Sequence, residues 1–292
     1  MSNHAPEHSK ISITAKLVAY YRQFSDIPFA KDVARYTGAD EAFREFIRAD
    51  GLNPDRLIEY APILEARYKS IVTLILKSGI KQVLELASGF SLRGLAMTRD
   101  PSISYVESDL KELTAEKENL IGEIRSLYRL ENRGNHHVAV ANALHPDELG
   151  KAADAFGRGR KLAVVNEGLV QYFSVAERET LAGNVRGLLK DFGGGVWITP
   201  DFMTKEDAMN ISPERKRFRQ VITGVTERGF YDAAFDSARQ MNEFFADFGF
   251  KADVRDQIDE TPFLSSVEIL GLSAGLAERA KSGLKVWVLS TV

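Results

Sequence analysis

The 292-residue sequence predicts an α/β protein with a mostly parallel sheet, an antiparallel terminal strand, an N-terminal helical cap and an inserted lid. From residue 62 onward, short apolar segments alternate with longer segments of helical periodicity, a pattern typical of a parallel sheet with helices on both faces. Residues 1–61 show helical spacing only. The chain closes with a helix, a strand, a long loop and the apolar segment Leu284–Leu289, with no helix after it. We therefore expect a cap at residues 1–61 and a sheet domain at residues 62–292.

The predicted cap consists of short helices. Apolar residues recur at helical spacing in Ala15–Phe24, Lys31–Tyr36 and Ala42–Ala49, and Asn53-Pro54 interrupts the pattern after them. We expect these helices to cover the crevice of the sheet domain.

The sheet domain begins with five expected strands, at Ile80–Leu86, Ile103–Glu107, His137–Ala141, Lys161–Asn166 and Val196–Thr199. Helices are expected at Ile63–Ser78, at Asp109–Leu130 and from the capping box at Ser174 to Phe192. Residues 203–235 are charged and weakly periodic, which indicates an inserted lid. The expected final elements are the helix Ala238–Phe248 and the strands Lys251–Arg255 and Leu284–Leu289, which suit an antiparallel hairpin.

Composition narrows the class of protein. The net charge of −3 and the pI near 6.0 give no broad attraction to nucleic acid or to an anionic membrane. The chain has no cysteine, which excludes disulfides and thiolate metal sites and suits a reducing compartment. Residues 1–10 lack the apolar core of a signal peptide, and no segment reaches the roughly 18 apolar residues of a membrane span. We expect a cytoplasmic protein that acts on a small molecule, with no metal.

Polar and small residues follow the predicted strands, where open α/β sheets bind their ligands. After the first strand comes Glu85–Ser91, a turn whose small residues let a ligand approach the backbone, although a tight turn without a ligand explains it too. Glu107 ends the second strand at about the 20-residue offset from which an acidic side chain holds ribose hydroxyls. Asp109 is explained as the N-cap of the next helix.

The third and fourth strands also end in polar groups. Asn142-Ala143 follows the third strand, and an Asn side chain can both donate to and accept from an adenine edge, although Asn is also common in loops for local reasons. Glu167 and Gly168 follow the fourth strand and lie within the predicted crevice.

Taken together, these segments resemble the leucine carboxyl methyltransferase family, which also holds polyketide O-methyltransferases of the tetracenomycin type. The resemblance spans about residues 12–200. It is carried by Arg67, Gln82–Arg93, Glu107–Asp109 and Asn166–Phe173 in this order, and more loosely by Thr14–Arg22. It implies a Rossmann-like class I methyltransferase sheet and S-adenosylmethionine as the cofactor.

The resemblance also implies roles for individual residues. Arg67 would pair with the methionine carboxylate of the cofactor, with Lys16 as a second cation, and Glu167 would face the methionine amino group. The backbone of Ala87 and Gly89 would lie beside the methionine portion, Glu107 would hold the ribose, and the adenine would meet Asn142 and Ala143.

This sequence departs from the family pattern at two of these positions. Ala87 replaces a usual glycine, which costs little where φ is negative, and Asn142 replaces a usual Asp, which keeps an acceptor but removes a charge.

The acceptor side is less defined. An O-methyltransferase needs no general base for a carboxylate acceptor, whereas a hydroxyl acceptor requires one. The candidates are Tyr21, His145 and Tyr172, for which core packing or a surface loop explains the residue about as well. Two alternatives to methyl transfer stay open, namely an NAD(P)-dependent oxidoreductase and a non-catalytic S-adenosylmethionine-binding protein.

Overall fold

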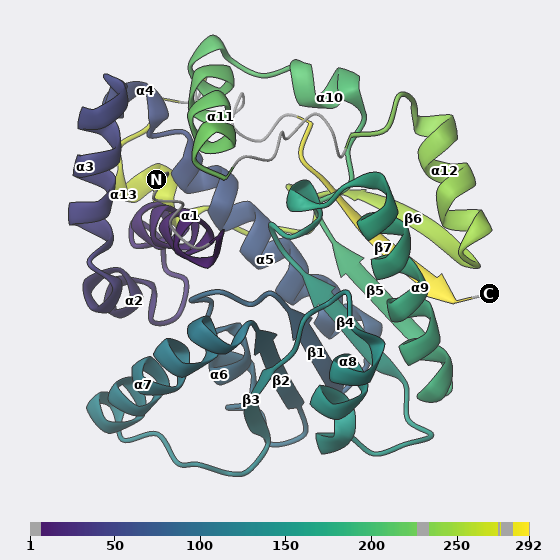
Figure 1. The fold of residues 1–292 in the computed structure, drawn as a ribbon. Helices are drawn as coiled ribbons and strands as arrows, with labels where there is room; N and C mark the ends of the chain where they lie inside the picture. The colour runs from purple at the N-terminus through teal and green to yellow at the C-terminus, as the bar shows by residue number, and fades with distance from the viewer. Residues whose placement is uncertain (1–6, 227–233, 274, 276–282, 292) are drawn as a thin grey trace, which may run out of the picture.

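The computed structural model describes residues 7–226, 234–273, 275 and 283–291 and contains one seven-stranded sheet of order β3-β2-β1-β4-β5-β7-β6 (Figure 1). The strands are β1 Gln82–Leu86, β2 Ser104–Asp109, β3 His136–Val140, β4 Leu162–Asn166, β5 Gly195–Thr199, β6 Phe250–Asp256 and β7 Lys285–Thr291. The first five strands pair in parallel, whereas β7 runs antiparallel to both β5 and β6. The predicted mostly parallel sheet with an antiparallel terminal strand is therefore confirmed.

The register of the central strands brings their carboxyl ends together. Glu85 of β1 lies beside Glu107 of β2, and Leu86 of β1 lies beside Asn166 of β4. Strand β1 is buried throughout and lies beside the central strand β4, and the strand order reverses between these two strands. The loops after β1, β2, β3 and β4 consequently meet at one edge, which is where such sheets bind ligands.

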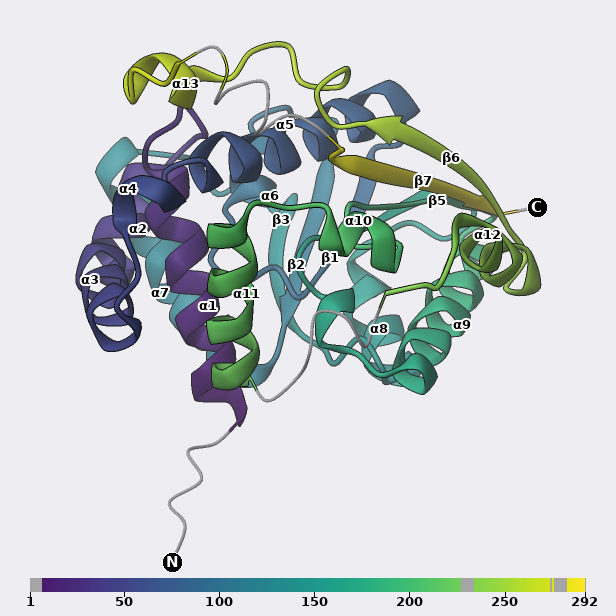
Figure 2. The same cartoon turned by 90° about the horizontal axis from the view of Figure 1, so that it is seen from above.

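Helices cover both faces of the sheet (Figure 2). One face packs against α5 (Tyr60–Ser78), whose Ile71, Leu74 and Ile75 share a core cluster with Val83 and Val165 of the sheet. The other face carries α8 (Pro146–Ala152), α9 (Val175–Asp191) and α12 (Ala238–Asp247). Outside residues 203–235, the other described α-helices of the sheet domain are α6 (Arg93–Met97), α7 (Lys111–Tyr128) and α13 (Ser265–Ile269). Helices thus bury the apolar side chains on both faces of the sheet, as the alternating sequence pattern predicts.

The described part of the predicted cap is helical. It contains α1 (Glu7–Arg22), α2 (Ala30–Thr37), α3 (Ala39–Asp50) and α4 (Pro54–Leu57), which gather at one side of the molecule (Figure 1). Residues 1–6 lie outside the described residues.

The predicted lid at 203–235 forms two helices, α10 (Lys205–Met209) and α11 (Pro213–Thr226), and its residues 227–233 lie outside the described residues. Helix α11 packs beside α1, as Figure 2 also shows, and its Phe218 and Ile222 share a core cluster with Leu17 and Phe46 of the cap. The described lid residues therefore extend the cap, and the division of the chain into cap, sheet domain and lid stays a prediction.

The sequence missed the short helices α4, α6, α8, α10 and α13, since four to seven residues are too few to show a helical period. It also ended the second strand too early. Strand β2 continues to Asp109, and the helix N-cap is Leu110 rather than Asp109. The strand therefore ends two residues later than predicted, and the acidic side chain at its carboxyl end is Asp109 rather than Glu107.

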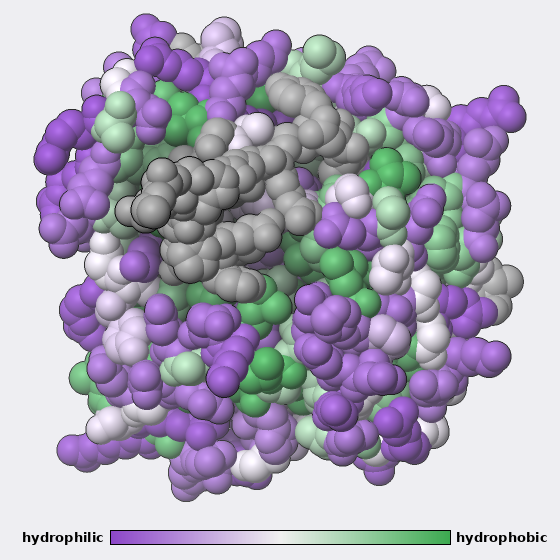
Figure 3. Space-filling view, viewed as in Figure 1, coloured by the Kyte–Doolittle hydropathy of each residue, from purple (hydrophilic) through white to green (hydrophobic). Residues whose placement is uncertain are grey.

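The described surface gives no sign of a membrane span or of a metal centre. No described helix combines the length and the apolar character needed to cross a membrane. Among the described residues, no group of three or more His, Cys, Asp or Glu side chains could hold a metal ion. The face seen in Figure 3 is mainly hydrophilic, and its apolar residues lie in small groups.

Two glycines provide a test of how the sheet is packed. Gly195 has φ 151°, and a Cβ at this position would lie 1.9 Å from the backbone oxygen of Leu162 on β4. Gly187 is an exposed residue of α9, and a Cβ there would meet nothing within 4 Å. We expect Gly195→Ala to lower the free energy of unfolding by about 3 kcal/mol or more, and Gly187→Ala to raise it by about 0.5–1 kcal/mol. Urea unfolding measures both, and equal effects of the two variants would contradict the described β4–β5 packing.

Candidate active site

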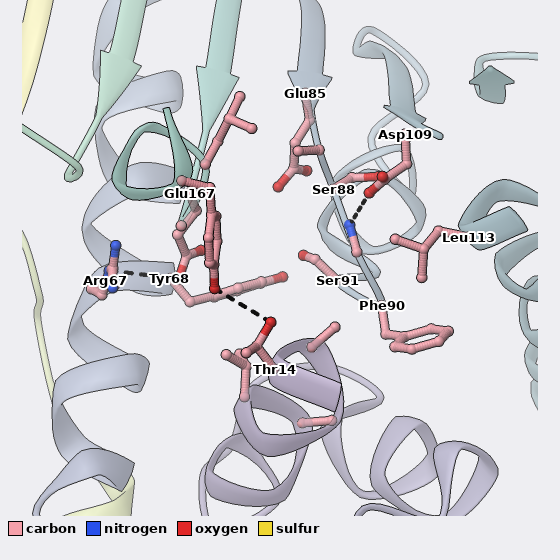
Figure 4. A pocket seen from close by; sticks show the side chains of 18 of the residues that line it. Thr14, Arg67, Tyr68, Glu85, Ser88, Phe90, Ser91, Asp109, Leu113 and Glu167 are labelled. Carbon is pink, nitrogen blue, oxygen red and sulfur yellow. Dashed lines mark hydrogen bonds and ion pairs between the residues drawn. The ribbon is translucent and has the colours of Figure 1, made fainter. Parts of the chain in front are cut away.

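A cavity of about 370 Å³ lies between the carboxyl ends of β1–β4 and the cap. Such a volume is within the range of small-molecule sites. Figure 4 shows its centre, with Arg67, Tyr68 and Glu167 on one side, Asp109 and Leu113 on the other, and Thr14 of α1 facing them. Further lining residues come from α1, the α1–α2 segment and the strand ends, and include Ala15, Val18, Arg22, Ile27, Glu85, Ala87, Gly89, Asn142, Ala143, Leu169 and Tyr172. The cap therefore encloses the ligand edge of the sheet, as expected from the sequence.

The turn after β1 forms part of the cavity wall. Ala87 and Gly89 both line the cavity, and both have positive φ values, 49° and 50°. Alanine at position 87 was expected to cost little where φ is negative, and the positive φ of Ala87 contradicts that condition. An alanine in the left-handed region costs roughly 1 kcal/mol or more, so other contacts must hold this turn.

Glu167 is the most strongly paired carboxylate of the cavity. One of its oxygens accepts a 2.5 Å hydrogen bond from Arg22 Nη2, the other accepts a 2.6 Å bond from Arg93 Nη2, and Arg67 Nε lies 3.9 Å away. Its side chain is only 10% exposed. Burial alone would raise the pKa of Glu167, but the guanidinium groups of Arg22, Arg93 and Arg67 outweigh it and lower the pKa to about 2.

Asp201, in the segment after β5, fixes the loop that carries Glu167. Its carboxylate accepts hydrogen bonds from the backbone N–H groups of Gly168 and Leu169 at 2.8 and 2.7 Å, and from Asn166 Nδ2 at 2.7 Å. Arg67 Nη2 donates to the same carboxylate at 2.8 Å. The position of Arg67 on α5 is thereby tied to the end of β4.

The three arginines around Glu167 still have donors to offer. The Tyr68 ring lies close to two of them, with its centroid 5.2 Å from Arg22 Cζ and 4.7 Å from Arg93 Cζ. In the part of the chain that the structure describes, the buried Nε atoms of Arg22, Arg67 and Arg93 have no hydrogen-bond partner. Buried donors of this kind are costly unless a ligand or water satisfies them. Since Arg22 and Arg67 line the cavity, they can receive an anionic group.

Glu107 is not in the cavity wall, contrary to the ribose role that the sequence implied. It is fully buried, and its carboxylate accepts a hydrogen bond from the backbone N–H of Gly94 at 2.7 Å and lies 3.1 Å from both His136 Nε2 and Lys117 Nζ. Burial would raise the pKa of Glu107, but Lys117, His136 and the Gly94 N–H lower it to about 2. The Glu107 carboxylate is therefore bound to groups of the protein beneath the cavity wall.

Asp109 lines the cavity where Glu107 was expected. One oxygen accepts a 2.7 Å hydrogen bond from the backbone N–H of Gly89, and the other accepts one from Leu110 at 2.8 Å. Burial raises the pKa of Asp109. The sequence could have indicated Asp109, because a predicted strand two residues longer ends at this residue.

The other residues implied for the cofactor are placed as follows. Asn142 and Ala143 line the cavity, and Asn142 also serves its own loop, since its Oδ1 accepts a 3.0 Å hydrogen bond from Leu144 N–H. Lys16, on α1, is half-buried and is not among the cavity-lining residues. The sequence did not assign Arg22, Glu85 or Asp109 to the cofactor, and the partner of Arg22, Glu167, lies 145 residues further along the chain.

The structure brings one of the three acceptor-side candidates into the cavity. Tyr172 lines it and donates a 3.3 Å hydrogen bond to Thr14 Oγ1. Tyr21 is buried among the aromatic rings of the cap, where the ring centroid of Phe43 lies 5.5 Å away. His145 is 59% exposed, and its Nδ1 lies 2.9 Å from Glu148 Oε1. Neither Tyr21 nor His145 lines the cavity, because Tyr21 lies on the face of α1 that packs in the cap and His145 lies in an exposed loop.

The strand order, the reversed last strand and the cavity at the carboxyl edge define a class I S-adenosylmethionine-dependent methyltransferase. The chain belongs to the leucine carboxyl methyltransferase family, whose model matches residues 28–186, more than half of the sequence. Family membership decides against the nicotinamide-dependent alternative.

Similarity to one solved structure supports the fold, and two further solved structures are similar to the chain. A protein from Thermobifida fusca YX assigned as a methyltransferase is 14% identical, covers 94% of each chain and has a TM-score of 0.53. An O-methyltransferase family protein from Burkholderia thailandensis is also 14% identical, over 96% of this chain and 71% of that one, with a TM-score of 0.49. The chain spans only 60% of a protein from Nostoc punctiforme PCC 73102 assigned as an O-methyltransferase, at 14% identity, 79% coverage of this chain and a TM-score of 0.48. No curated protein sequence matches significantly.

The cavity fits the cofactor of this family. S-adenosylmethionine carries a zwitterionic amino-acid end, and the cavity offers the carboxylates of Glu85 and Glu167 beside Arg67, whose Nε has no hydrogen-bond partner among the described residues. Asp109 lies further along the wall, at the end of the neighbouring strand β2. The paired charges at one end and the separate acid at the other suit an elongated ligand with a charged head.

The low pKa of Glu167 makes a prediction about acid stability. A carboxyl group with a pKa below its unfolded value stabilises the fold above the unfolded pKa, and this contribution disappears as the pH falls toward the folded pKa. With a folded pKa of about 2, the wild type should lose about 2 kcal/mol more than Glu167→Gln between pH 6 and pH 3. Urea unfolding at both pH values measures the difference. Parallel losses in the two proteins would show that Glu167 is not held ionised by its arginines.

Proposed function

We propose that this methyltransferase transfers the methyl group to a carboxylate oxygen of a small molecule with an apolar body. The observation that carries the proposal is the state of the ionisable groups in the cavity. None of the described residues that line the cavity is a histidine, and Glu167 is held at a pKa of about 2, which makes it a poor base near neutral pH. Burial raises the pKa of Tyr172, so its hydroxyl stays protonated. An acceptor that arrives already ionised needs none of these groups as a base.

Residues of this chain would hold the cofactor along the ends of β1–β4. Arg67 would pair with the methionine carboxylate and Glu167 with the amino group, while the backbone of the Ala87–Gly89 turn lies beside them. Asp109 would hold the ribose in place of Glu107, and Asn142 with Ala143 would meet the adenine. These assignments follow from which residues reach the cavity and from the charge of each group.

The acceptor would bind beneath the cap, next to Arg22. S-adenosylmethionine supplies a methyl group on a sulfonium, and transfer to a carboxylate oxygen forms a C–O bond as the C–S bond breaks, with no proton to remove. Arg22 Nε, which has no hydrogen-bond partner in the described part of the chain, can orient the acceptor carboxylate. Val18, Leu64 and Leu169 line the same cavity with apolar surface. Correct alignment of the reacting groups is the main contribution that such a site makes. The apolar lining favours a polyketide-like or other secondary metabolite.

The setting that we propose for this reaction is the cytoplasm, with a small molecule rather than a nucleic acid as the partner. The absence of cysteine suits a reducing compartment, and the net charge of −3 makes a nucleic-acid partner unfavourable.

The proposed carboxylate acceptor has a direct chemical test. The protein is incubated with S-adenosylmethionine labelled in its methyl group and with a fraction of small organic acids, and the labelled product is treated with mild alkali. A methyl ester releases volatile labelled methanol, and this is the expected result. An alkali-stable label would identify a hydroxyl acceptor and overturn the carboxylate assignment, and a protein treated with heat serves as the control for non-enzymatic methylation.

The cofactor assignment predicts different effects for the two neighbouring acids of β2. Asp109→Asn should weaken S-adenosylmethionine binding about tenfold, because it removes a charged acceptor from the cavity wall. Glu107→Gln should lower the free energy of unfolding by about 3 kcal/mol, because it removes the buried carboxylate that neutralises Lys117, and should change affinity less than about threefold. Calorimetry and urea unfolding of both variants measure these quantities. A larger loss of affinity in Glu107→Gln than in Asp109→Asn would return the ribose role to Glu107.

A further inference from the structure

Lys117 of α7 buries its ammonium group beneath the turn that follows β1. Its side chain has no exposed surface. Lys117 Nζ donates a 2.8 Å hydrogen bond to Ser88 Oγ and lies 3.1 Å from Glu107 Oε2. A buried lysine is costly unless it is paired and hydrogen-bonded, and this one is both. It is not among the cavity-lining residues, although the turn it contacts is.

The surroundings of Lys117 explain why a cation is needed there. Glu85, Glu107 and Asp109 come from the ends of adjacent strands, where burial acts to raise the pKa of each carboxyl group and the positive charge of Lys117 acts to lower it. Arg93 neutralises Glu85 on the other side, where it forms an ion pair with that carboxylate. Lys117 therefore acts on both acids of β2, whereas His136 contacts Glu107.

Ser88 is held from two directions. Its backbone N–H donates a 3.0 Å hydrogen bond to the carbonyl of Ser108 on β2, and its hydroxyl accepts the bond from Lys117. On the other side of Ala87, Leu86 belongs to β1 and is aligned with Asn166 of β4. Ala87 must connect these two fixed residues, and it does so with φ 49°. Glycine would adopt this conformation without a steric penalty, whereas alanine resists it.

We propose that the hydrogen bond from Lys117 to Ser88 holds the turn in the left-handed shape that a glycine would take unaided, and that Lys117 is thereby a positioning residue for S-adenosylmethionine. Without this bond, Ala87 can relax toward negative φ, which displaces the backbone of residues 87–89 that lines the cavity. The lysine and the alanine then form a coupled pair, since the bond matters only because position 87 is not glycine. This inference rests on cofactor binding in the cavity and not on the nature of the acceptor.

The coupling is measured by a double-mutant cycle on the dissociation constant for S-adenosylmethionine, determined by calorimetry without any acceptor. We expect Lys117→Met to weaken binding about tenfold in the background that keeps Ala87. In the Ala87→Gly background, Lys117→Met should weaken binding only about twofold, a coupling of about fivefold. Equal losses in both backgrounds would overturn the proposal, since they would show that Lys117 acts independently of the turn.

Two further variants separate the bond from the charge and from folding. Ser88→Ala removes the acceptor hydroxyl but keeps the buried charge, and it should also weaken binding in a way that Ala87→Gly relieves. Should Lys117→Met prove unfolded by circular dichroism, the cycle of Ser88→Ala with Ala87→Gly decides the question. Lys111→Met removes an exposed lysine from the same helix and should leave the dissociation constant unchanged. If the wild type binds S-adenosylmethionine and Ser88→Ala binds it with the same dissociation constant, the proposed role of the Lys117–Ser88 hydrogen bond is refuted. If the wild type does not bind S-adenosylmethionine, the cofactor assignment itself is refuted.

Discussion

The neutralisation of buried carboxylates at the carboxyl edge of the sheet is the constraint on which the rest of the site depends. Glu85, Glu107 and Asp109 end β1 and β2, and Glu167 follows β4, so parallel register alone places acids side by side in a region shielded from water. Charges in such surroundings are stable only when they are paired and hydrogen-bonded. Each distant element that reaches this edge supplies a cation. Helix α1 supplies Arg22, α5 supplies Arg67, α6 supplies Arg93 and α7 supplies Lys117.

These pairs also explain why cap and sheet form one site. The bond from Arg22 to Glu167 links the last turn of α1 to the end of β4, and the bond from Arg67 to Asp201 links α5 to the segment after β5. Neither contact is an exposed surface pair, and both are therefore less screened by salt than surface pairs are. The cavity wall is consequently assembled from helices that are far apart in sequence.

Much of the fold was predictable from sequence, whereas the site was predictable only in part. Strands β1 and β4 were predicted because they are buried and largely apolar, as in Val83–Leu86 and Leu162–Val165. The helices between the strands were predicted from their clear periodicity. The family motifs located Arg67, Ala87, Gly89, Asn142, Ala143 and Glu167 at the cavity. Glu107 was chosen over Asp109 because the end of a strand is the least certain part of such a prediction. The left-handed conformation of Ala87 and the partners of Arg22 and Lys117 depend on tertiary packing, which no local pattern reports.

The place of β7 in the sheet has a consequence for how the chain folds. This strand follows every other described strand in the sequence but lies between β5 and β6, with which it pairs in an antiparallel manner. Its Trp287 completes the aromatic core on that side, since the indole donates a hydrogen bond to the carbonyl of Phe202 and the ring lies 5.3 Å from that of Phe245. During synthesis, β5 keeps an unpaired edge until β7 has left the ribosome. The pairing of β5 with β7 joins residues far apart in the sequence, such as Val196 and Ser290, and is therefore slow relative to local helix formation. The aromatic core beside these strands is consequently the last part of the molecule to become shielded from aggregation.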